Sequence, residues 1–475
     1  MRNRFTTPGR LLGGALLGLA LLPWATVQAE HDLRGITGPT FNLYASPFNI
    51  SLPEGSSLYM WGYGDLGRGA NATHAEGNGV FLPQYPGPTL VVTEGQQVTI
   101  NLTNFGVPDT LPTASGSANN PVSIVVTGHN LGASGGTPDL VTNGAMNGQT
   151  VTYTFTAGKP GTYVYHSLGG PNPGLHVEMG LLGALIVRPV DGSRSAYGAG
   201  TGTDYDQEFL YLLSEADPDV HFQMERGHYG HFTNHDRFAT IYFVNGRVYP
   251  DLVQGDYNPL FPHQPYQSLA MAHPRDKVLV RNVNAGHDSH PFHYHGENHR
   301  FIGRDGNMLS SDGLVANLGR SDNTINSAPK QSVDAIWTWT GKDLGWDIYG
   351  NPADPAYAHT CSSASCTDGN GDGRDDGTGE ACWDDVTREY CPDHGKPLPV
   401  TLPGVAELTL GGFWSGSPYM GDVGDLPPGE GGLNPNGGYF FVWHSHAEKE
   451  LTTFDIFPGG SLSAMVVLPT SVTIE

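Results

Sequence analysis

Two short segments place histidines two residues apart on what the pattern predicts to be β-strands. Residues 290–296 read His-Pro-Phe-His-Tyr-His-Gly, and residues 441–446 read Phe-Val-Trp-His-Ser-His. Side chains two apart on a strand point to the same face. If the two strands are neighbours, four imidazoles meet in one pocket, and they are His293, His295, His444 and His446. Imidazole clusters suit copper, zinc, iron or nickel, so we predict a transition-metal site here.

Short apolar runs between turn residues predict that these histidines lie in an all-β fold. The 475 residues include 66 glycines and 36 prolines, and long helical periodicities are few. Strands at this spacing without intervening helices are typical of β-sandwiches. The expected strands of the first half are 88–93, 97–102, 122–126, 151–156, 162–166 and 181–188. Those of the second half are 209–213, 241–244, 277–283, 290–295, 335–340, 439–446 and 463–468.

The chain divides into a leader and two domains. We expect residues 1–29 to be a secretory signal peptide, because arginines precede an apolar run and a Val-Gln-Ala cleavage site. The predicted domains are 36–195 and 204–475. In the second domain the β pattern lapses over about 350–438, in an insertion rich in Gly, Pro and Asp. Loops of this length inside a domain are usually functional or mobile.

The charge and apolar composition of the chain limit the molecules and surfaces that it can bind. The chain has 23 Lys and Arg against 47 Asp and Glu, a formal net charge of −24, which repels nucleic acid and anionic lipid surfaces. Beyond the leader, no stretch approaches the roughly 18 apolar residues of a membrane-spanning helix. We therefore expect a periplasmic or secreted protein that binds no nucleic acid and does not cross a membrane.

All four cysteines lie in the insertion. In an oxidising compartment this clustering predicts local disulfides, whose pairing the sequence leaves open. No cysteine belongs to a Cys-x-x-Cys pair and no histidine is spaced for a zinc finger, so a structural zinc site is the less favoured alternative. The residues are Cys361, Cys366, Cys382 and Cys391.

An acidic stretch of the insertion alternates oxygen-bearing side chains in the manner of a calcium-binding loop. The candidate ligands are Asp368, Asn370, Asp372 and Asp376. The bidentate acid expected at the twelfth position is missing, because that position is Gly379. A calcium loop and a merely solvated acidic loop are therefore equal alternatives.

The histidine segments resemble motifs of the multicopper oxidases. Residues 290–296 resemble the C-terminal histidine motif of that family, and Trp-His-Ser-His at 443–446 resembles its His-Cys-His motif with serine in place of cysteine. Pro-Gly-Pro-Thr at 86–89 and Gly-Thr-Tyr-Val-Tyr-His-Ser at 161–167 extend the resemblance to the first half. It covers nearly the whole mature chain except the insertion. The fold it implies is two cupredoxin-like Greek-key β-sandwich domains.

The resemblance implies a copper site with fewer ligands than usual. His293, His295, His444 and His446 match ligands of the family's type 2/type 3 copper cluster. His166 matches a further ligand, and its spacing to His176 is closer to two-domain copper nitrite reductases. The family's three-copper cluster needs eight histidines, and only five can be placed. We therefore expect one or two copper ions, with another transition metal as the alternative.

The resemblance also implies that blue copper is absent, because such a centre depends on a cysteine thiolate. Ser445 and Ser167 stand where that cysteine would be. Of the remaining ligand positions, His290 is kept, Glu450 replaces the second histidine, and Asp455 lies near the axial position. These three residues would suit a harder cation such as manganese. The favoured alternative is a hydrogen-bonded polar cluster.

These inferences lead to two hypotheses of function. The first is a secreted copper-binding oxidoreductase of the multicopper oxidase type, acting on a small molecule, a metal ion or oxygen. The second is a non-catalytic metal-binding or structural cupredoxin protein, since a fold alone does not establish activity. Two-domain members of the superfamily are often trimers that build the cluster between chains. The separation of His166 from the other four histidines fits a homotrimer, and a closed monomer is the alternative.

Overall fold

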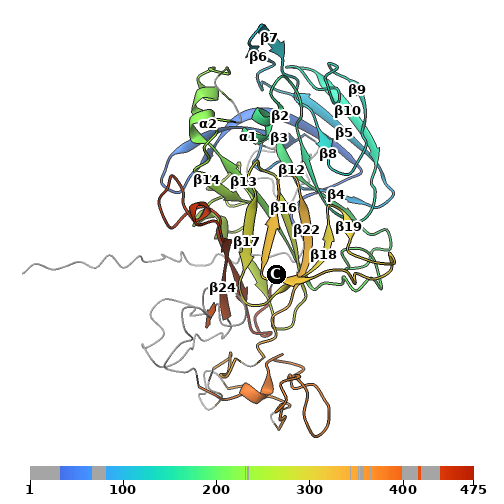
Figure 1. Cartoon of the computed structure of the whole chain (residues 1–475), viewed down its shortest axis with the longest axis vertical. Helices are drawn as coiled ribbons and strands as arrows, with labels where there is room; N and C mark the ends of the chain where they lie inside the picture. Colours follow the sequence, from blue (N-terminus) through green and yellow to red (C-terminus); the bar gives the residue numbers. More distant parts are fainter. Residues whose placement is uncertain are drawn as a thin grey trace, which may run out of the picture.

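The structure, a computed structural model, describes residues 33–66, 82–230, 232, 235–342, 344–350, 352, 358–363, 365–397, 416–418 and 439–474. The predicted leader at 1–29 lies outside these residues. Strands dominate the described part and are arranged in four large sheets and a small hairpin (Figure 1). The all-β prediction is thus confirmed.

Two five-stranded sheets form the first sandwich. One has the order β1 (Ile36–Thr37), β4 (Leu90–Thr93), β12 (Leu182–Arg188), β11 (Gly161–His166) and β8 (Val125–Val126). The other has the order β3 (Ser57–Asp65), β2 (Thr40–Ser51), β5 (Gln97–Asn104), β10 (Thr150–Thr156) and β9 (Gly132–Gly135). A hairpin of β6 (Thr110–Thr113) and β7 (Gly116–Asn119) lies apart from both sheets.

Strict alternation of buried apolar residues with more exposed residues explains why these segments form strands. In β5, Val98, Ile100 and Leu102 are buried, while the residues between them are partly exposed. A period of two places every second side chain on one face of a sheet, and that face is apolar here. The expected strand at 122–126 is shorter than predicted, because Val122 pairs with Ala145 whereas only β8 pairs with β11.

Two larger sheets form the second sandwich. One has the order β14 (Ile241–Val244), β13 (Gln207–Ala216), β16 (Val278–Asn284), β22 (Ser332–Trp337), β18 (His299–Arg304) and β19 (Asn307–Met308), with β20 (Ser321–Asp322) beside β18. The other has the order β15 (Ala270–Ala272), β25 (Leu462–Val467), β24 (Tyr439–Ser445), β17 (His290–Tyr294) and β21 (Thr324–Ser327). In this sheet β23 (Gly416–Pro418) also pairs with β24.

An apolar interface joins the two sandwiches. Side chains of β3 and β12, such as Met60 and Leu182, share a buried cluster with Leu212 of β13 and Phe243 of β14. Buried apolar area stabilises a contact by roughly 25 cal/mol per Å². The sandwiches are therefore held against each other by a core of their own, next to the cores inside each sandwich.

In the part of the chain that the structure describes, helices are few and short. They are α1 (Pro173–Glu178), α2 (Pro218–Glu225) and the 3₁₀ turns η1 (Asp251–Val253), η2 (Cys391–Asp393) and η3 (Glu448–Leu451). Each α-helix starts with a proline, which suits the first turn because its missing N–H has no partner there. Within the described residues no helix is long and apolar enough to cross a membrane.

The insertion extends beyond the far end of the second sandwich (Figure 1). Its described residues contain little regular structure apart from η2 and β23. Two disulfides link it, Cys361 to Cys391 and Cys366 to Cys382. The predicted local disulfides are confirmed, and the pairing that the sequence left open is now assigned.

Candidate metal centre

The two histidine segments lie on neighbouring antiparallel strands. β17 pairs with β24 so that His293 stands directly opposite His444. Phe292 and Tyr294 alternate with the histidines and point into the core of the second sandwich, as Trp443 does from β24. The odd-numbered side chains of β17 therefore lie on the other face of this sheet, where the imidazoles meet.

The four imidazoles form a compact cluster. The ring centroid of His293 lies 4.7 Å from that of His295, 5.5 Å from His444 and 4.5 Å from His446. The Nε2 atoms of His295 and His444 are 3.1 Å apart. Ligand nitrogens of His293, His444 and His446 all lie within 4.8 Å of one another, which could accommodate a metal ion.

Hydrogen bonds fix which ring nitrogens carry protons. The hydroxyl of Thr324 donates to Asn323 Oδ1 (3.1 Å), so its oxygen accepts the Nδ1–H of His293 at 2.9 Å. His444 donates its own Nδ1–H to the carbonyl of Ser445 at 2.7 Å. Both Nε2 atoms are then left with a lone pair, as a metal ligand requires. His293 Nε2 is buried without any hydrogen-bond partner.

The electrostatic setting keeps these rings neutral. Burial and the neighbouring rings of His295, His446 and His444 lower the pKa of His293 to about 3. Burial also lowers the pKa of His444. His446 is exposed at the rim, whereas His293 is only 2% exposed. His293 and His444 are therefore unprotonated nitrogen donors, in a cluster that opens to solvent on the side of His446.

Thr324 is expected to act as a positioning residue for His293. Replacing it with valine keeps the shape but removes the acceptor of the Nδ1–H, and loss of such a partner weakens metal binding by about 10- to 100-fold. Titration of each purified variant with copper measures the change. Thr324→Ser keeps the hydroxyl and should bind copper as the unchanged chain does. Equal affinities of the valine and serine variants would contradict this role.

His166 is not brought to the four other histidines within one chain. It ends β11 in the first sandwich, next to β8, and donates its Nδ1–H to the carbonyl of Ser167 at 3.1 Å. Burial lowers its pKa to about 4, with smaller contributions from Lys330 and His287. Its assignment as a ligand of the same cluster therefore stays a prediction that requires a second chain.

In the first sandwich, hydrogen bonds saturate Ser167 and His176, the residues where the resemblance would place a blue copper centre. Ser167 donates its hydroxyl to His176 Nδ1 (2.6 Å), and His176 donates its Nε2–H to Asn120 Oδ1 (2.7 Å). The backbone N–H of Ser123 donates to Ser167 Oγ (3.0 Å). All four residues are buried. Since both ring nitrogens of His176 are engaged, this histidine offers no lone pair to a metal.

In the second sandwich, carboxylates occupy the corresponding place. His290 projects from β17 toward β13 and donates from Nε2 to Glu215 Oε2 (2.9 Å) and from Nδ1 to Glu450 Oε2 (3.0 Å). Arg237 contacts the other oxygen of Glu215 at 2.6 Å. Asp455, in contrast, is exposed. The structure thus shows a buried ionic cluster of His290 and Glu450 from which Asp455 is separate, in line with the polar-cluster alternative.

This cluster predicts a specific dependence of stability on pH. Burial alone would lower the pKa of His290, but hydrogen bonds and charges of Glu215 and Glu450 outweigh burial and raise it from 6.5 to about 10. Its stabilisation is therefore complete below pH 6.5 and is lost as pH rises through about 10. Burial would raise the pKa of Glu215, but His290 and Arg237 lower it from 4.5 to about 2, so its contribution is present above pH 4.5 and is lost toward pH 2.

Denaturant unfolding of the unchanged chain and of His290→Gln across pH 5 to pH 10 tests this expectation. The difference between their free energies of unfolding should shrink by about 1.4 kcal/mol per pH unit above pH 6.5, because one proton is released on unfolding. A difference that stays constant with pH over that range would contradict the raised pKa.

The acidic loop of the insertion is organised by its own backbone. Asp368 accepts the N–H groups of Asp372 (2.9 Å) and Gly373 (2.7 Å), and Asp376 accepts that of Gly369 (2.9 Å). Asn370 donates its side-chain N–H to Asp372 at 3.2 Å. Among the described residues, these acids do not form one of the groups close enough to hold a metal ion. Calcium binding here stays a prediction.

A second group with metal-binding geometry was missed by sequence reasoning. It consists of Asp347, His359, Glu389 and His394. The four residues are spread over almost fifty positions without a regular spacing. The sequence features noted near them were the clustered cysteines, which predicted disulfides, and the acidic stretch, which predicted a calcium loop at other residues.

Comparisons with known proteins agree with the fold. A multicopper oxidase family model matches residues 78–192. The copper-containing nitrite reductase of Alcaligenes xylosoxydans xylosoxydans is 28% identical over 239 residues, which cover 50% of this chain and 63% of that enzyme. The nitrite reductase of Pseudomonas chlororaphis is 32% identical over 162 residues (34% and 39%). The L-ascorbate oxidase of Cucurbita pepo var. melopepo is 31% identical over 137 residues (28% and 21%).

One solved structure, described as the multicopper oxidase mgLAC, matches 92% of this chain and 87% of its own with a TM-score of 0.50 and 17% identity, which supports the fold. The chain spans less than two thirds of the length of each curated relative named above. Residues 78–192 are thus similar to the multicopper oxidase family, and parts of the chain are similar to copper-containing nitrite reductases. The fold is the cupredoxin-like fold of a multicopper oxidase.

Proposed function

We propose that this chain is an extracytoplasmic copper-binding oxidoreductase with a reduced, histidine-ligated copper site and no blue copper. The observation that carries the proposal is the pair of lone pairs on His293 Nε2 and His444 Nε2, each fixed by a hydrogen bond at Nδ1. A buried ring nitrogen without a partner is costly unless something binds it. His293 Nε2 is such an atom, and the adjacent His295 and His444 fit a copper ion.

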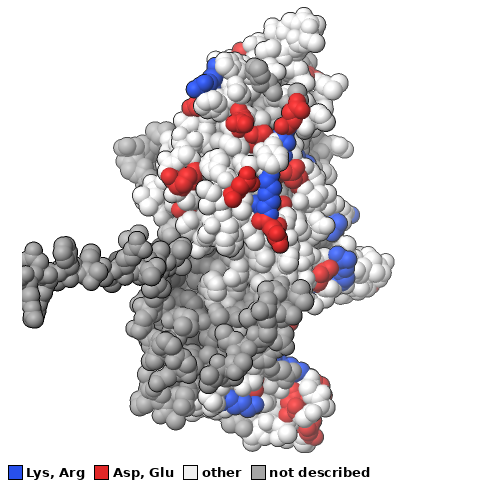
Figure 2. All heavy atoms as spheres, turned by 60° about the vertical axis from the view of Figure 1, so that its left-hand side comes forward, with Lys and Arg blue, Asp and Glu red and all other residues white. Residues whose placement is uncertain are grey.

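The residues of the proposed site have different roles, because some hold the metal and others border the side open to solvent. Bound copper would supply one-electron redox chemistry. His293 and His295 lie on the buried side and hold the ligand geometry, while exposed His446 marks the side from which a small molecule or metal ion can approach. The net charge of −24 favours the approach of cationic substrates. On the face drawn in Figure 2, basic side chains are few and stand among acidic ones.

The proposed absence of blue copper rests on the two serine positions. Ser167 is buried and hydrogen-bonded to His176, and Ser445 is buried and accepts the backbone N–H of Ala447 at 3.1 Å. A hydroxyl cannot replace the soft thiolate that this type of centre needs. Copper-loaded protein is therefore expected to lack the intense absorption of a copper–thiolate bond.

We further propose that the site is completed by His166 of a second copy in a homotrimer. The two sandwiches of one chain hold His166 and the other four histidines apart, as an arrangement between chains requires. Light scattering of the copper-loaded chain should give a trimer mass. His166→Ala should lower the number or affinity of bound copper ions and leave His293, His295 and His444 in place. A monomer whose copper binding is unaffected by His166→Ala would contradict this arrangement.

The alternative is a protein that binds metal without catalysis, and serine in place of both blue-copper cysteines favours it. A turnover assay distinguishes it from the oxidoreductase. Copper-loaded protein is assayed for oxygen-dependent oxidation of phenols, ferrous ion and manganous ion. The proposal expects oxidation of at least one of these, abolished in His444→Ala and unchanged in His228→Ala, a control at an exposed histidine. Rates that do not depend on His444 would favour a protein that binds metal without turnover.

A location outside the cytoplasm is part of the proposal. The two disulfides fit an oxidising compartment, and the predicted signal peptide at 1–29 fits export. Fractionation of cells that express the full chain should recover it, shortened by about 29 residues, outside the cytoplasm.

A further inference from the structure

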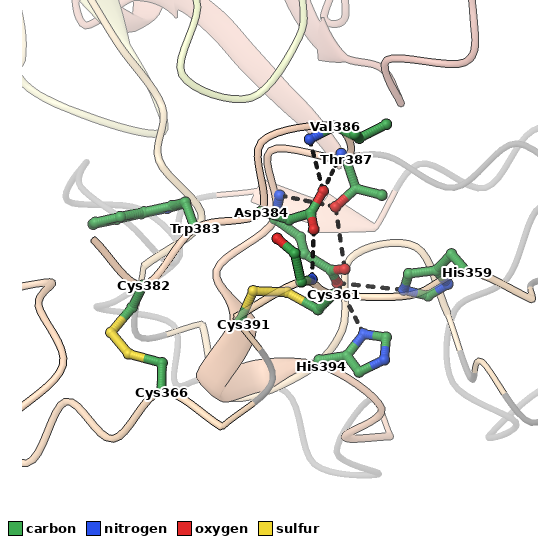
Figure 3. The surroundings of a disulfide bond; sticks show 12 residues. His359, Cys361, Cys366, Cys382, Trp383, Asp384, Val386, Thr387, Cys391 and His394 are labelled. Atoms are coloured by element: carbon green, nitrogen blue, oxygen red, sulfur yellow. Dashed lines mark hydrogen bonds and ion pairs between the residues drawn. A yellow bond between two sulfur atoms is a disulfide. The ribbon is translucent and has the colours of Figure 1, made fainter. Parts of the chain in front are cut away.

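We infer that the insertion holds a closed, zinc-type metal site formed by two imidazoles and two carboxylates. Figure 3 shows His359 and His394 converging from two sides next to the Cys361–Cys391 disulfide. The inference concerns different residues from the copper cluster and does not depend on the function proposed for it. The four ligands are Asp347, His359, Glu389 and His394.

The distances fit a four-coordinate ion. His359 Nε2 lies 3.1 Å from Asp347 Oδ2 and 3.3 Å from Glu389 Oε2. His394 Nδ1 lies 3.5 Å and 3.3 Å from the same two oxygens. A tetrahedral zinc ion with bonds of about 2.0–2.1 Å holds its ligand atoms about 3.3–3.4 Å apart. The four nitrogen–oxygen distances, 3.1–3.5 Å, are thus close to the edge length of such a tetrahedron.

Hydrogen bonding alone does not account for this arrangement. Each ring nitrogen carries at most one proton, yet His359 Nε2 faces two carboxylate oxygens, and so does His394 Nδ1. Contacts of 3.3 to 3.5 Å are long for a charged hydrogen bond. A cation between the four atoms would satisfy all of them at once.

Two buried carboxylates need positive charge nearby, and His359 and His394 supply it only when they are protonated. The side chains of Asp347 and Glu389 are 0% and 3% exposed, and buried charges are normally paired or bound to metal. The neighbouring basic residues are directed elsewhere, since Arg388 pairs with Asp276 and Lys396 with Asp393.

Further contacts hold the ligands in place, as the outer shell of a metal site does. Asp347 Oδ1 accepts the backbone N–H of Tyr349 at 2.9 Å, and Oδ2, the oxygen that faces the rings, also accepts that of Gly395 at 2.7 Å. Thr387 donates its hydroxyl to Glu389 Oε1 at 3.1 Å, so Oε2 is the oxygen that faces the histidines.

The disulfide joins the segments that carry the ligands. Cys361 follows His359 by two residues, while Cys391 lies between Glu389 and His394. The cross-link therefore brings three of the four ligands together, whereas Asp347 comes from the segment after β22. Imidazole and carboxylate ligands suit several first-row divalent ions. Four protein ligands without an open position favour structural zinc.

Element analysis of the full-length chain tests the site. Protein incubated with zinc and passed over a desalting column is expected to retain about one zinc ion at these residues. His359→Ala/His394→Ala should lose that ion. Asp385→Asn, which changes an exposed acid of the same insertion, should keep it. His293→Ala/His444→Ala should also keep it, which separates this site from the copper cluster.

Zinc content that is the same in His359→Ala/His394→Ala as in the unchanged chain would overturn the inference, as would a chain that retains no zinc or only copper here. Free-thiol titration shows whether the disulfides form in each variant. If the His359→Ala/His394→Ala variant fails to form its disulfides, the Glu389→Gln variant tests the site instead, because glutamine keeps the shape of the glutamate side chain. Its zinc affinity should fall by at least about 10-fold, and an unchanged affinity would overturn the site.

Discussion

Replacing both His293 and His444 with alanine is expected to abolish copper binding at the histidine cluster. These residues stand opposite each other on β17 and β24, and each presents an unprotonated Nε2 to the cavity. Since loss of an outer partner alone weakens a metal site by about 10- to 100-fold, loss of two ligands should weaken it by more than about 100-fold. Competitive titration against a copper chelator measures the change.

A matched control excludes a general effect of removing histidines. His228→Ala/His273→Ala removes two histidines from outside the cluster, and copper affinity should then stay within about twofold of the unchanged chain. Circular dichroism should show the same β content in both double variants, because His293 and His444 lie on the face away from the apolar core. Copper affinity that survives in the His293→Ala/His444→Ala variant would refute the ligand assignment.

Replacing Arg237 with methionine is expected to lower the free energy of unfolding strongly, and by more than replacing an exposed arginine. Arg237 contacts Glu178 and Glu215 with two different nitrogens, and both carboxylates have fully buried side chains. Breaking a buried ion pair from one side leaves an uncompensated charge, which costs about 3–5 kcal/mol. Urea unfolding of the full chain measures the change in free energy.

An exposed arginine provides the comparison. Arg320 pairs with Asp322 at 3.2 Å, but its side chain is 69% exposed. Surface pairs contribute about 0–1 kcal/mol, so Arg320→Met should lower the free energy of unfolding by no more than that. If Arg237→Met is no more destabilising than Arg320→Met, the ionic cluster does not stabilise the fold as proposed.

The two clusters explain why β17 is central to this protein. His293 and His295 face the candidate copper site, whereas His290 lies beside the sheet that contains β13. One five-residue strand therefore contributes His293 to the metal cluster and His290 to an ionic contact with the other sheet of the second sandwich. A change in either cluster is expected to shift the strand and so to affect the other one.

The part of the site that sequence predicts is the part set by strand periodicity. Spacing of two put His293 beside His295 and His444 beside His446, and the structure adds that β17 and β24 are neighbours. That pairing is a long-range contact across some 150 residues, so local pattern alone could not establish it. The resemblance to multicopper oxidases supplied the expectation instead.

The remaining polar clusters could not be predicted, because they depend on tertiary packing. Glu215 and Arg237 were unremarked in the sequence, yet they set the charge around His290. Glu389 meets His359 and His394 where the Cys361–Cys391 disulfide joins their segments, and Asp347 reaches them from the segment just before the insertion. Neither group has a spacing that any regular element would produce.

Copper is proposed to bind between four imidazoles without a sulfur donor. Anomalous scattering at the copper absorption edge, from crystals of copper-loaded protein, locates the metal. Density for one or two copper ions is expected within about 2.0–2.1 Å of ring nitrogens of the cluster, and none beside Ser167 or Ser445. Copper bound beside either serine, or four imidazoles without copper between them, would contradict it.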